Sequence, residues 1–425
     1  MQIKQIAATV LLFLTTFGVM YLIPVSKQGD RTLYGGVVEL ETPGGPLPFK
    51  LSYHRNHFDS HGFTGWIKFG FAESTPVQIE SPSDEADDII VRFPHYDSVL
   101  ELKSVDDGPM SGTWRKNRGS KGTAIMDAKL VGDRRDELFA SLPHAEEDAD
   151  FEGRWSVKFE SSEGLSVGQF YTIDLDEFVS AQGTFMTTTG DYRFLAGRVD
   201  GNLMRLSTFD GAHAFLFHAR MQDDGTIEGD FWSGNWHHET WTATRDDDAA
   251  LPDAFGQTVI ADEDALDDMV FKNLDGDPTR VLDVLDASNA KARIIEIFGT
   301  WCPNCLDAAR ELVSLKEHYG DDLAVVGLAF EIVEDFERSV QQVKRHHEHI
   351  GTDWPILIAG LSDKDKASAA LPVLDKVRSY PTLIFLDRNN EVQGVYSGFS
   401  GPATGDAYTQ QRERFEALID AMVEE

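Results

Sequence analysis

The sequence contains very little cysteine: two residues in 425, three positions apart at Cys302 and Cys305. A small extracellular domain stapled by disulfides carries more cysteines, spread along its chain, so that class is excluded. A structural disulfide between residues this close would restrain almost no chain entropy. Two cysteines in one short motif therefore indicate chemistry rather than cross-linking.

Positive charge is also scarce, with 38 Lys and Arg against 72 Asp and Glu and a formal net charge of −34. Such a chain repels polyanions, so we expect no nucleic-acid partner. Hydrophobic residues make up 41% of the chain and include 27 Phe and 8 Trp, which argues against disorder over most of its length. At 425 residues it is too long for one ordinary core, so several domains are expected.

The one long apolar run lies at the N-terminus, from Ile6 to Ile23. It is at the lower limit for crossing a membrane and longer than most signal-peptide cores. The bulky residues Tyr21–Pro24 offer no small-residue cleavage site, and no cysteine follows for lipidation. We therefore expect an uncleaved signal anchor through residues 6–23, with the remainder in the cell envelope, on the periplasmic or extracytoplasmic side of the inner membrane.

Residues 34–248 contain three pairs of similar segments, which indicates a duplicated β-rich unit. The pairs are Tyr34–Val37 with Phe151–Arg154, Phe93–Asp97 with Leu206–Asp210, and Asp107–Trp114 with Asp224–Phe231. Short runs of β-forming residues separated by Asp-Gly turns predict strands. We expect an antiparallel barrel or sandwich in each copy and no substantial helix between residues 34 and 130.

The acidic stretch Asp246–Pro252 is predicted to be a linker, and after Phe271 the pattern changes to alternating strands and helices. Strands are predicted at Arg293–Phe298, Leu323–Phe330 and Thr382–Asp387, and helices at Leu306–Tyr319, Val333–His349 and Gln411–Val423. This alternation favours a sheet covered on both faces. The expected multi-domain order is a signal anchor and linker (residues 1–33), two β-rich repeats (34–150 and 151–248) and an α/β domain (249–425).

The strongest signal is the strand–turn–helix segment that contains both cysteines. A hydrophobic strand ends at Phe298, and Cys302-Pro303-Asn304-Cys305 opens a helix. The first sulfur then lies over free N–H groups at the positive helix end, which favours the thiolate. The second lies one turn further, close enough to attack a mixed disulfide. This predicts dithiol–disulfide exchange without a cofactor, with Cys302 as the attacking thiol and Cys305 as the resolving thiol.

A metal site is the alternative to redox chemistry. Zinc would need two further nitrogen or sulfur ligands, and no second C-x-x-C motif exists. His237 and His238 are adjacent on a predicted strand and point to opposite faces, so they cannot easily share an ion. The string Asp210–His213 is predicted to be a turn. Three clustered histidines on one predicted helix are expected to form a solvated face: His346, His347 and His349.

The segment Gly299–Cys305, together with Tyr380-Pro381-Thr382 before a Leu383–Asp387 strand, resembles TlpA-type thiol–disulfide oxidoreductases of the thioredoxin superfamily. The resemblance covers roughly residues 255–425 and implies a thioredoxin fold in an exported, usually membrane-tethered protein. It also implies that Pro381 is the cis-proline facing the cysteines, where it would expose the Tyr380 backbone to a substrate strand. Candidate substrate-binding residues are Trp301, Tyr380 and Thr382.

Two acids are candidates for proton transfer. The resemblance implies that Glu296 is a buried acid beneath the second cysteine, where a raised pKa would let it serve Cys305 as general base. Glu331 ends a predicted strand, at a place where TlpA-like proteins often carry a glutamate near the cysteines. The alternatives are an exposed strand-edge acid for Glu296 and a helix-entry acid for Glu331.

The expected function is a reductase of disulfide-bearing exported proteins, resupplied by an upstream thiol donor protein, with the β repeats positioning partners. The direction of electron flow stays open, because Pro303-Asn304 is not the Gly-Pro of thioredoxin and a proline after the first cysteine is similar to the oxidase DsbA. Two other readings remain. One is an envelope ligand- or protein-binding module that uses the thioredoxin fold as an adaptor, and the other is a disulfide isomerase or oxidase.

Overall fold

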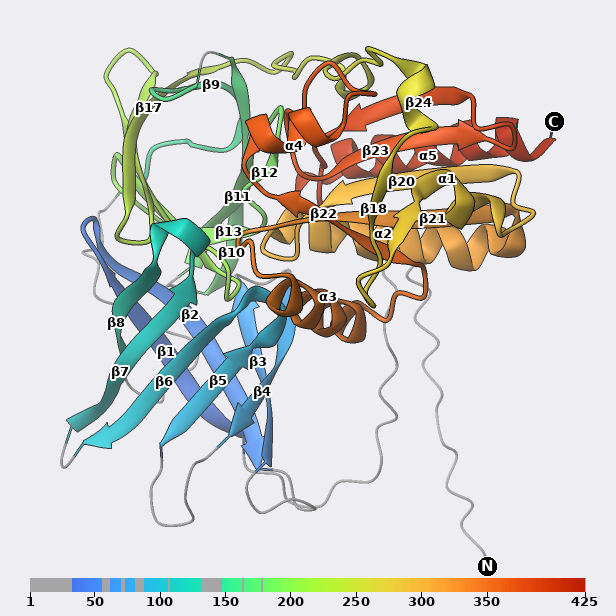
Figure 1. Ribbon diagram of the computed structural model, residues 1–425. Coiled ribbons are helices and arrows are strands. Elements are labelled where there is room, and N and C mark those ends of the chain that lie inside the picture. Colours follow the sequence, from blue (N-terminus) through green and yellow to red (C-terminus); the bar gives the residue numbers. More distant parts are fainter. Residues whose placement is uncertain are drawn as a thin grey trace, which may run out of the picture. The chain divides into compact units, whose positions relative to one another are not determined.

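The computed structural model describes residues 33–424 except for 56–61, 70–72, 81–87, 106–107, 132–146, 163 and 177–178 (Figure 1). The apolar run at residues 6–23, expected to be an anchor, lies outside the described residues. Among the helices that are described, none has the length and apolar character needed to cross a membrane.

The first β-rich segment is a closed antiparallel barrel in which each strand pairs with the next and β1 pairs with β8. Side chains alternate between inside and outside, as along β8, where Ala124, Met126 and Ala128 are buried and their neighbours are exposed. The strands are β1 (Leu33–Thr42), β2 (Gly45–Arg55), β3 (Gly62–Phe69), β4 (Glu73–Glu80), β5 (Ile89–Phe93), β6 (Ser98–Val105), β7 (Gly108–Asn117) and β8 (Thr123–Val131).

The second β-rich segment is an antiparallel sheet in the order β10-β9-β17-β16-β15-β14-β13-β11-β12. An additional pairing of β10 with β11 closes this sheet into a ring around an aromatic core that includes Trp155, Phe185 and Phe217. The strands are β9 (Gly153–Phe159), β10 (Ser166–Asp176), β11 (Val179–Thr187), β12 (Gly190–Asp191), β13 (Leu195–Asp200), β14 (Leu203–Phe209), β15 (Ala214–Met221), β16 (Ile227–Ser233) and β17 (His237–Arg245).

Both segments are therefore barrel-like and antiparallel, as the sequence predicts. The three matched pairs of sequence segments lie on or beside strands at equivalent places: β1 and β9 open their rings, β5 and β14 come fifth along each ring when short β12 is left out, and β7 and β16 come seventh. In the middle pair, Phe93–Asp97 lies mostly in a 3-10 turn after β5, whereas Leu206–Asp210 lies mostly in β14. The duplication stays a prediction. Between residues 34 and 130 the described helices are the short 3-10 turns η1 (Pro94–Tyr96) and η2 (Gly119–Lys121), in agreement with the prediction.

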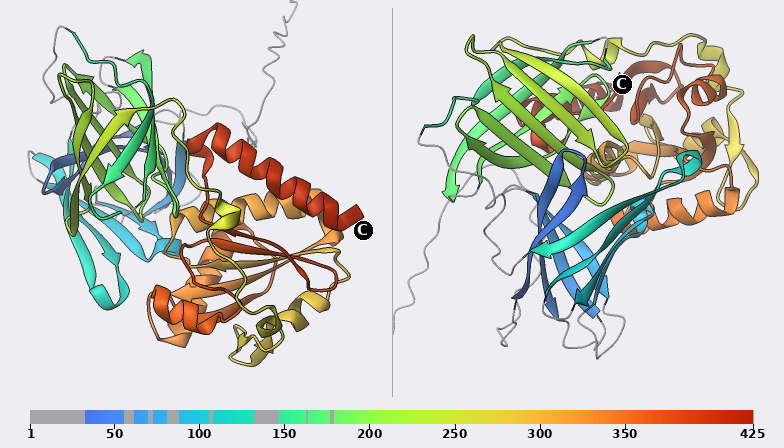
Figure 2. Two further views of the ribbon diagram at one scale, coloured as in Figure 1. Left: turned by 90° about the horizontal axis from the view of Figure 1, so that it is seen from above. Right: turned by 90° about the vertical axis from the view of Figure 1, so that its left-hand side faces the viewer.

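Residues after the linker form a mixed sheet in the order β19-β18-β22-β21-β20-β23-β24, with β20, β21 and β22 parallel and β23 antiparallel to β20. Figure 2 shows α5 on one face of this sheet and α1 and α4 on the other. The elements are β18 (Val270–Lys272), β19 (Pro278–Arg280), α1 (Val281–Asp286), β20 (Ala292–Phe298), α2 (Pro303–Tyr319), β21 (Leu323–Glu331), α3 (Phe336–Ile350), β22 (Ile356–Leu361), α4 (Lys364–Ala370), β23 (Thr382–Asp387), β24 (Val392–Ser397) and α5 (Asp406–Glu424).

The predicted strands and helices of this part are confirmed, with shifted ends. The helix expected from Val333 begins at Phe336, because the side chain of Asp335 accepts a hydrogen bond from the backbone N–H of Arg338 and caps it there. The terminal helix starts at Asp406, five residues before the expected Gln411. Strands β22 and β24 were not predicted, since their short sequences lack a clear alternation of apolar and polar residues.

The expectation of a solvated histidine face on α3 is wrong. His346 is 2% exposed and packs against Phe298, while the ring of His349 stacks on His95 at 3.7 Å between centroids. Burial lowers the pKa of His346 to about 3 and that of His349 to about 4. The error arose because α3 packs against η1 of the first barrel, where Gln342 donates to the carbonyl oxygens of Pro94 and His95 at 2.9 and 2.7 Å.

The core of the α/β part generates a stability prediction. Phe385 on β23 is fully buried, with ring centroids 5.2 Å from Phe415 and 6.2 Å from Phe255. We expect Phe385→Ala to lower the free energy of unfolding of this part by about 3–5 kcal/mol, through lost burial and an unfilled cavity. Val270→Ala is the control, because Val270 is 50% exposed. Urea unfolding followed by tryptophan fluorescence measures both variants, and equal losses would contradict this packing.

Candidate active site

The two cysteines lie at the start of α2, directly after the loop that follows β20. Cys302 occupies the N-cap position, and its sulfur accepts a hydrogen bond from the backbone N–H of Cys305 at 3.4 Å. Pro303 fills the first helical position, where its missing N–H costs nothing. Both thiols are free; Cys302 is 7% exposed and Cys305 fully buried.

The two sulfurs have different electrostatic surroundings. Burial raises the pKa of Cys305 well above its usual range, and the adjacent Cys302 sulfur adds to this effect. Cys302 instead sits at the positive end of α2, where free N–H groups stabilise a thiolate. The geometry therefore suits Cys302 as nucleophile and Cys305 as a thiol that ionises only when a base assists it.

Glu296 lies on β20 beneath the cysteines. Its carboxyl group is 1% exposed, and its Oε1 atom has no hydrogen-bond partner. Burial, together with the charge of Cys302, raises the pKa of Glu296 to about 8. Because the charge of Glu296 in turn acts on Cys305, a proton held here is coupled to both sulfurs. The alternative of an exposed strand-edge acid does not apply.

Glu331 ends β21 and supports the loop in front of the cysteine motif. Its carboxylate accepts hydrogen bonds from the backbone N–H and the hydroxyl of Thr300, at 3.0 and 2.8 Å. Burial raises the pKa of Glu331 to about 7, although both Thr300 hydrogen bonds oppose the shift. Glu331 is thus placed to position the residues before Cys302, and it lies outside the helix α3 that follows.

The loop before β23 meets the cysteines from the other side. The peptide bond between Tyr380 and Pro381 is cis, and the Cys302 thiol donates to the carbonyl oxygen of Tyr380 at 3.5 Å. The Trp301 indole packs edge-on against the Tyr380 ring and donates to the Phe330 carbonyl at 2.9 Å. Thr382 is fully buried, and its hydroxyl donates to the Ser379 carbonyl. Substrate binding by Trp301, Tyr380 and Thr382 stays a prediction.

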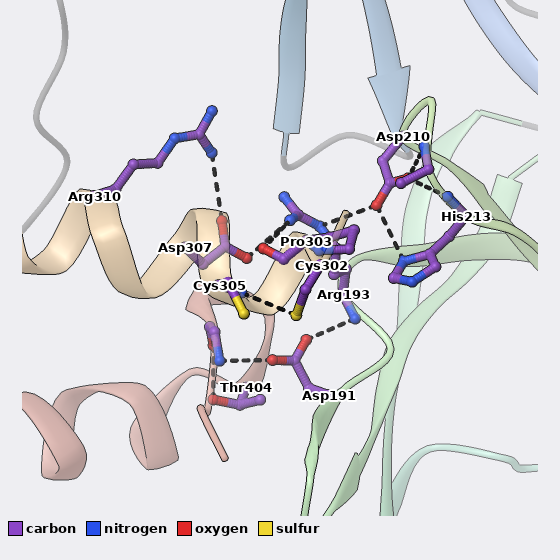
Figure 3. Close-up of polar contacts among 12 residues, drawn as sticks. Asp191, Arg193, Asp210, His213, Cys302, Pro303, Cys305, Asp307, Arg310 and Thr404 are labelled. Atoms are coloured by element: carbon purple, nitrogen blue, oxygen red, sulfur yellow. Dashed lines mark hydrogen bonds and ion pairs between the residues drawn. The ribbon is translucent and has the colours of Figure 1, made fainter. Parts of the chain in front are cut away.

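A buried cluster of charges from the second β segment reaches the start of α2, and sequence reasoning missed it (Figure 3). Arg193, between β12 and β13, donates to the Pro303 carbonyl at 3.2 Å and pairs with Asp307 at 3.0 Å. Asp191 accepts from the backbone N–H of Gly401 at 2.6 Å. Asp210, in the predicted turn, lies 3.7 Å from Nε of Arg193.

The first barrel contributes a further cation, Lys116 on β7. Its ammonium group donates to the Ala212 carbonyl at 2.6 Å. Burial lowers the pKa of Lys116 to about 8, while the charges of Asp210 and Cys302 oppose that shift. The charge of Cys302 therefore acts on a cation of the first barrel. In the described residues, no group of three or more His, Cys, Asp or Glu side chains is arranged to hold a metal ion.

A sheet with three parallel strands and an antiparallel pair, a C-x-x-C motif opening α2 and a cis-proline opposite it define a thioredoxin fold. No protein-family model matches the chain. The thioredoxin-like protein YneN of Bacillus subtilis (strain 168) is 29% identical over 131 residues, which are 31% of this chain and 68% of that protein. This similarity supports the thioredoxin superfamily for the C-terminal part, without distinguishing the TlpA type.

Three solved structures each match between 34% and 41% of the chain. A DsbF homologue from Corynebacterium diphtheriae is 19% identical with a TM-score of 0.29, and covers 41% of this chain and 98% of its own. A thiol:disulfide interchange protein DsbE described as putative, from Chlorobium tepidum, is 16% identical with a TM-score of 0.27, and covers 36% of this chain and 92% of its own. The exposed lipoprotein thioredoxin Etrx1 from Streptococcus pneumoniae is 22% identical with a TM-score of 0.23, and covers 34% of this chain and 97% of its own.

Glu296 generates a prediction on the pH dependence of stability. Its pKa is about 8 in the folded protein against 4.5 ordinarily, so folding favours the protonated acid. The wild type should therefore lose stability as the pH rises from about 4.5 to about 8, by about 1.4 kcal/mol per unit of pKa shift. Glu296→Gln cannot ionise, and we expect its advantage over the wild type to grow across that window. Unfolding curves at several pH values give the free energy of unfolding of both proteins. If the two free energies change with pH in parallel, Glu296 is not a buried acid with a raised pKa.

Proposed function

We propose that this protein is a thiol–disulfide oxidoreductase that reduces disulfides of exported proteins. The observation that carries the proposal is the paired environment of the two sulfurs: Cys302 at the helix end beside the Tyr380 carbonyl, and Cys305 buried above the protonated Glu296. Such an arrangement separates an attacking thiolate from a resolving thiol that becomes nucleophilic only when a base removes its proton.

The reaction divides into two exchanges. The Cys302 thiolate attacks one sulfur of the substrate disulfide, a mixed disulfide forms, and the other substrate sulfur leaves and takes a proton. In the mixed disulfide Cys302 carries no charge and no longer raises the pKa of Glu296, so Glu296 releases its proton to solvent. The Glu296 carboxylate then accepts the Cys305 proton, and the resulting thiolate attacks the Cys302 sulfur. The substrate leaves with its second thiol, two electrons have passed to it, and a Cys302–Cys305 disulfide remains for an upstream thiol donor to reduce.

The site of action is proposed to be the extracytoplasmic side of a membrane. This rests on the apolar sequence of residues 6–23, which precedes a long folded part. The β-rich segments, proposed as repeats over 34–150 and 151–248, would position partner proteins for the domain over 249–425.

The opposite direction, oxidation of substrate dithiols, is a second candidate that one observation favours. Lys116 and the α2 N-terminus both place positive charge near Cys302, and stabilising the thiolate stabilises the reduced form. The reduction potential of the Cys302–Cys305 pair, measured against glutathione, separates the two directions. A value near about −270 mV supports a reductase, and one near about −120 mV supports an oxidase.

Cysteine variants test the redox function itself. We expect Cys302→Ser to abolish insulin reduction with dithiothreitol as donor, because no attacking thiol remains. Cys305→Ser should form a mixed disulfide that persists until an external thiol cleaves it, detected by non-reducing electrophoresis. A wild type no more active than Cys302→Ser would contradict the proposal and favour a binding module that uses the fold as an adaptor.

A further inference from the structure

The face of the thioredoxin fold that carries the reactive sulfur is covered. Cys302 is 7% exposed, Tyr380 is 6% exposed, and Pro303 and Pro381 are also buried. A folded protein needs open backbone around a sulfur in order to bring its own disulfide within bonding distance. The described residues leave almost no open backbone around the Cys302 sulfur, because another part of the chain covers this face.

The cover is Thr187–Arg193, the turn between β11 and β13 that contains β12, here called the cap segment. It touches the cysteine motif directly: a Cβ atom added at Gly190 would lie 1.7 Å from the amide nitrogen of Asn304. It also touches the loop after β24, since a Cβ at Gly398 would lie 2.9 Å from the Thr188 carbonyl oxygen. The cap segment therefore contacts both the start of α2 and the loop after β24, and Gly398 of that loop in turn donates to the Pro381 carbonyl oxygen.

Polar contacts hold the cap segment at the same two places. Arg193 donates to the Pro303 carbonyl and pairs with Asp307 on α2, and Asp191 accepts from the Gly401 backbone (Figure 3). Asp191 also accepts from the Arg193 backbone N–H at 2.6 Å, which ties the two anchors together. Because Arg193 and Asp307 are each about 5% exposed, breaking one partner leaves a buried charge uncompensated.

We infer that the cap segment determines the substrate range of the site by keeping folded-protein disulfides from Cys302 while small disulfides still reach it. The inference rests on the proposed function and deepens it. A protein substrate must displace the turn before its sulfur meets Cys302, whereas a small reagent needs only the narrow exposed part of that sulfur. The closed fraction of the cap then reduces the rate for large substrates alone.

Two variants weaken the cap from different sides. Gly190→Ala inserts a methyl group against Asn304, and Asp191→Asn removes the charge that accepts from Gly401. Gly225→Ala is the matched control: Gly225 also has a positive φ, of 81°, and lies in the turn between β15 and β16 of the same sheet, but nothing lies within 4 Å of an added Cβ. Thermal unfolding and circular dichroism establish that each variant is folded, and if Gly190→Ala is not, Asp191→Asn carries the test.

The rate at which maleimides alkylate Cys302 in the reduced full-length protein measures how far the cap segment restricts access to this sulfur, and it does not require turnover. Rates are measured with N-ethylmaleimide and with a maleimide that carries a polyethylene glycol chain. We expect Asp191→Asn to raise the ratio of the large-reagent rate to the small-reagent rate by about tenfold, as loss of one charge-assisted hydrogen bond implies. Gly190→Ala should raise this ratio through its steric clash with Asn304, and Gly225→Ala should leave it unchanged. A ratio that does not rise in a folded cap variant, or rises equally in the control, overturns the inference.

Insulin reduction then separates this inference from the proposed function. If the proposed function holds, the cap variants should reduce insulin about tenfold faster than the wild type, with equal rates on a small aromatic disulfide. If no variant reduces insulin while the alkylation ratio rises, the cap is supported and the reductase proposal fails. If insulin is reduced equally by all variants and the alkylation ratio is flat, the reductase stands and the cap fails.

Discussion

The buried pairing of Arg193 with Asp307, on the helix that begins with the cysteine motif, ties the β-rich segments to the thioredoxin fold. The same guanidinium donates to the Pro303 carbonyl and approaches Asp210, so one side chain contacts both the motif and a turn of its own sheet. A buried arginine with carboxylates on two elements fixes their separation more strictly than apolar contact does, because a small shift leaves charge unpaired. The covered active site follows from this constraint.

The electrostatics of the site follow from the burial of Cys305 and Glu296 and from the position of Cys302 at the N-terminus of α2. Cys305 and Glu296 are both buried; the charge of Glu296 raises the pKa of Cys305, and the charge of Cys302 raises the pKa of Glu296. Cys302 sits at the N-terminus of α2, and its charge acts on Lys116 of the first barrel. The contrast between two sulfurs one helical turn apart is thus set by elements of three different parts of the chain rather than by the C-x-x-C motif alone.

Local pattern accounts for what the sequence allowed us to predict. The strand Thr382–Asp387 coincides with β23. The buried position of Glu296 was expected from the family resemblance rather than from the local pattern, and it agrees with β20, in which every residue is buried. The contacts of Arg193 were out of reach, since its partner Pro303 lies 110 residues away and no local period marks a buried arginine in a turn. The Asp210–His213 turn was predicted, but its link to Arg193 joins two separate turns of one sheet, which no local pattern indicates.

The two β segments share a strand order and yet meet the thioredoxin fold differently. The first barrel presents η1 to α3, where His95 stacks on His349, and presents Lys116 to the region of Cys302. The second presents the cap segment, whose short β12 has no counterpart in the first barrel. The cap segment contacts both parts of the molecule. Asp191 and Arg193 bind the thioredoxin fold, while Tyr192 between them packs on Phe185 and Phe231 of its own ring. The position of the cap over the cysteine motif is therefore fixed from two sides, which is the property expected of an element that sets access to Cys302.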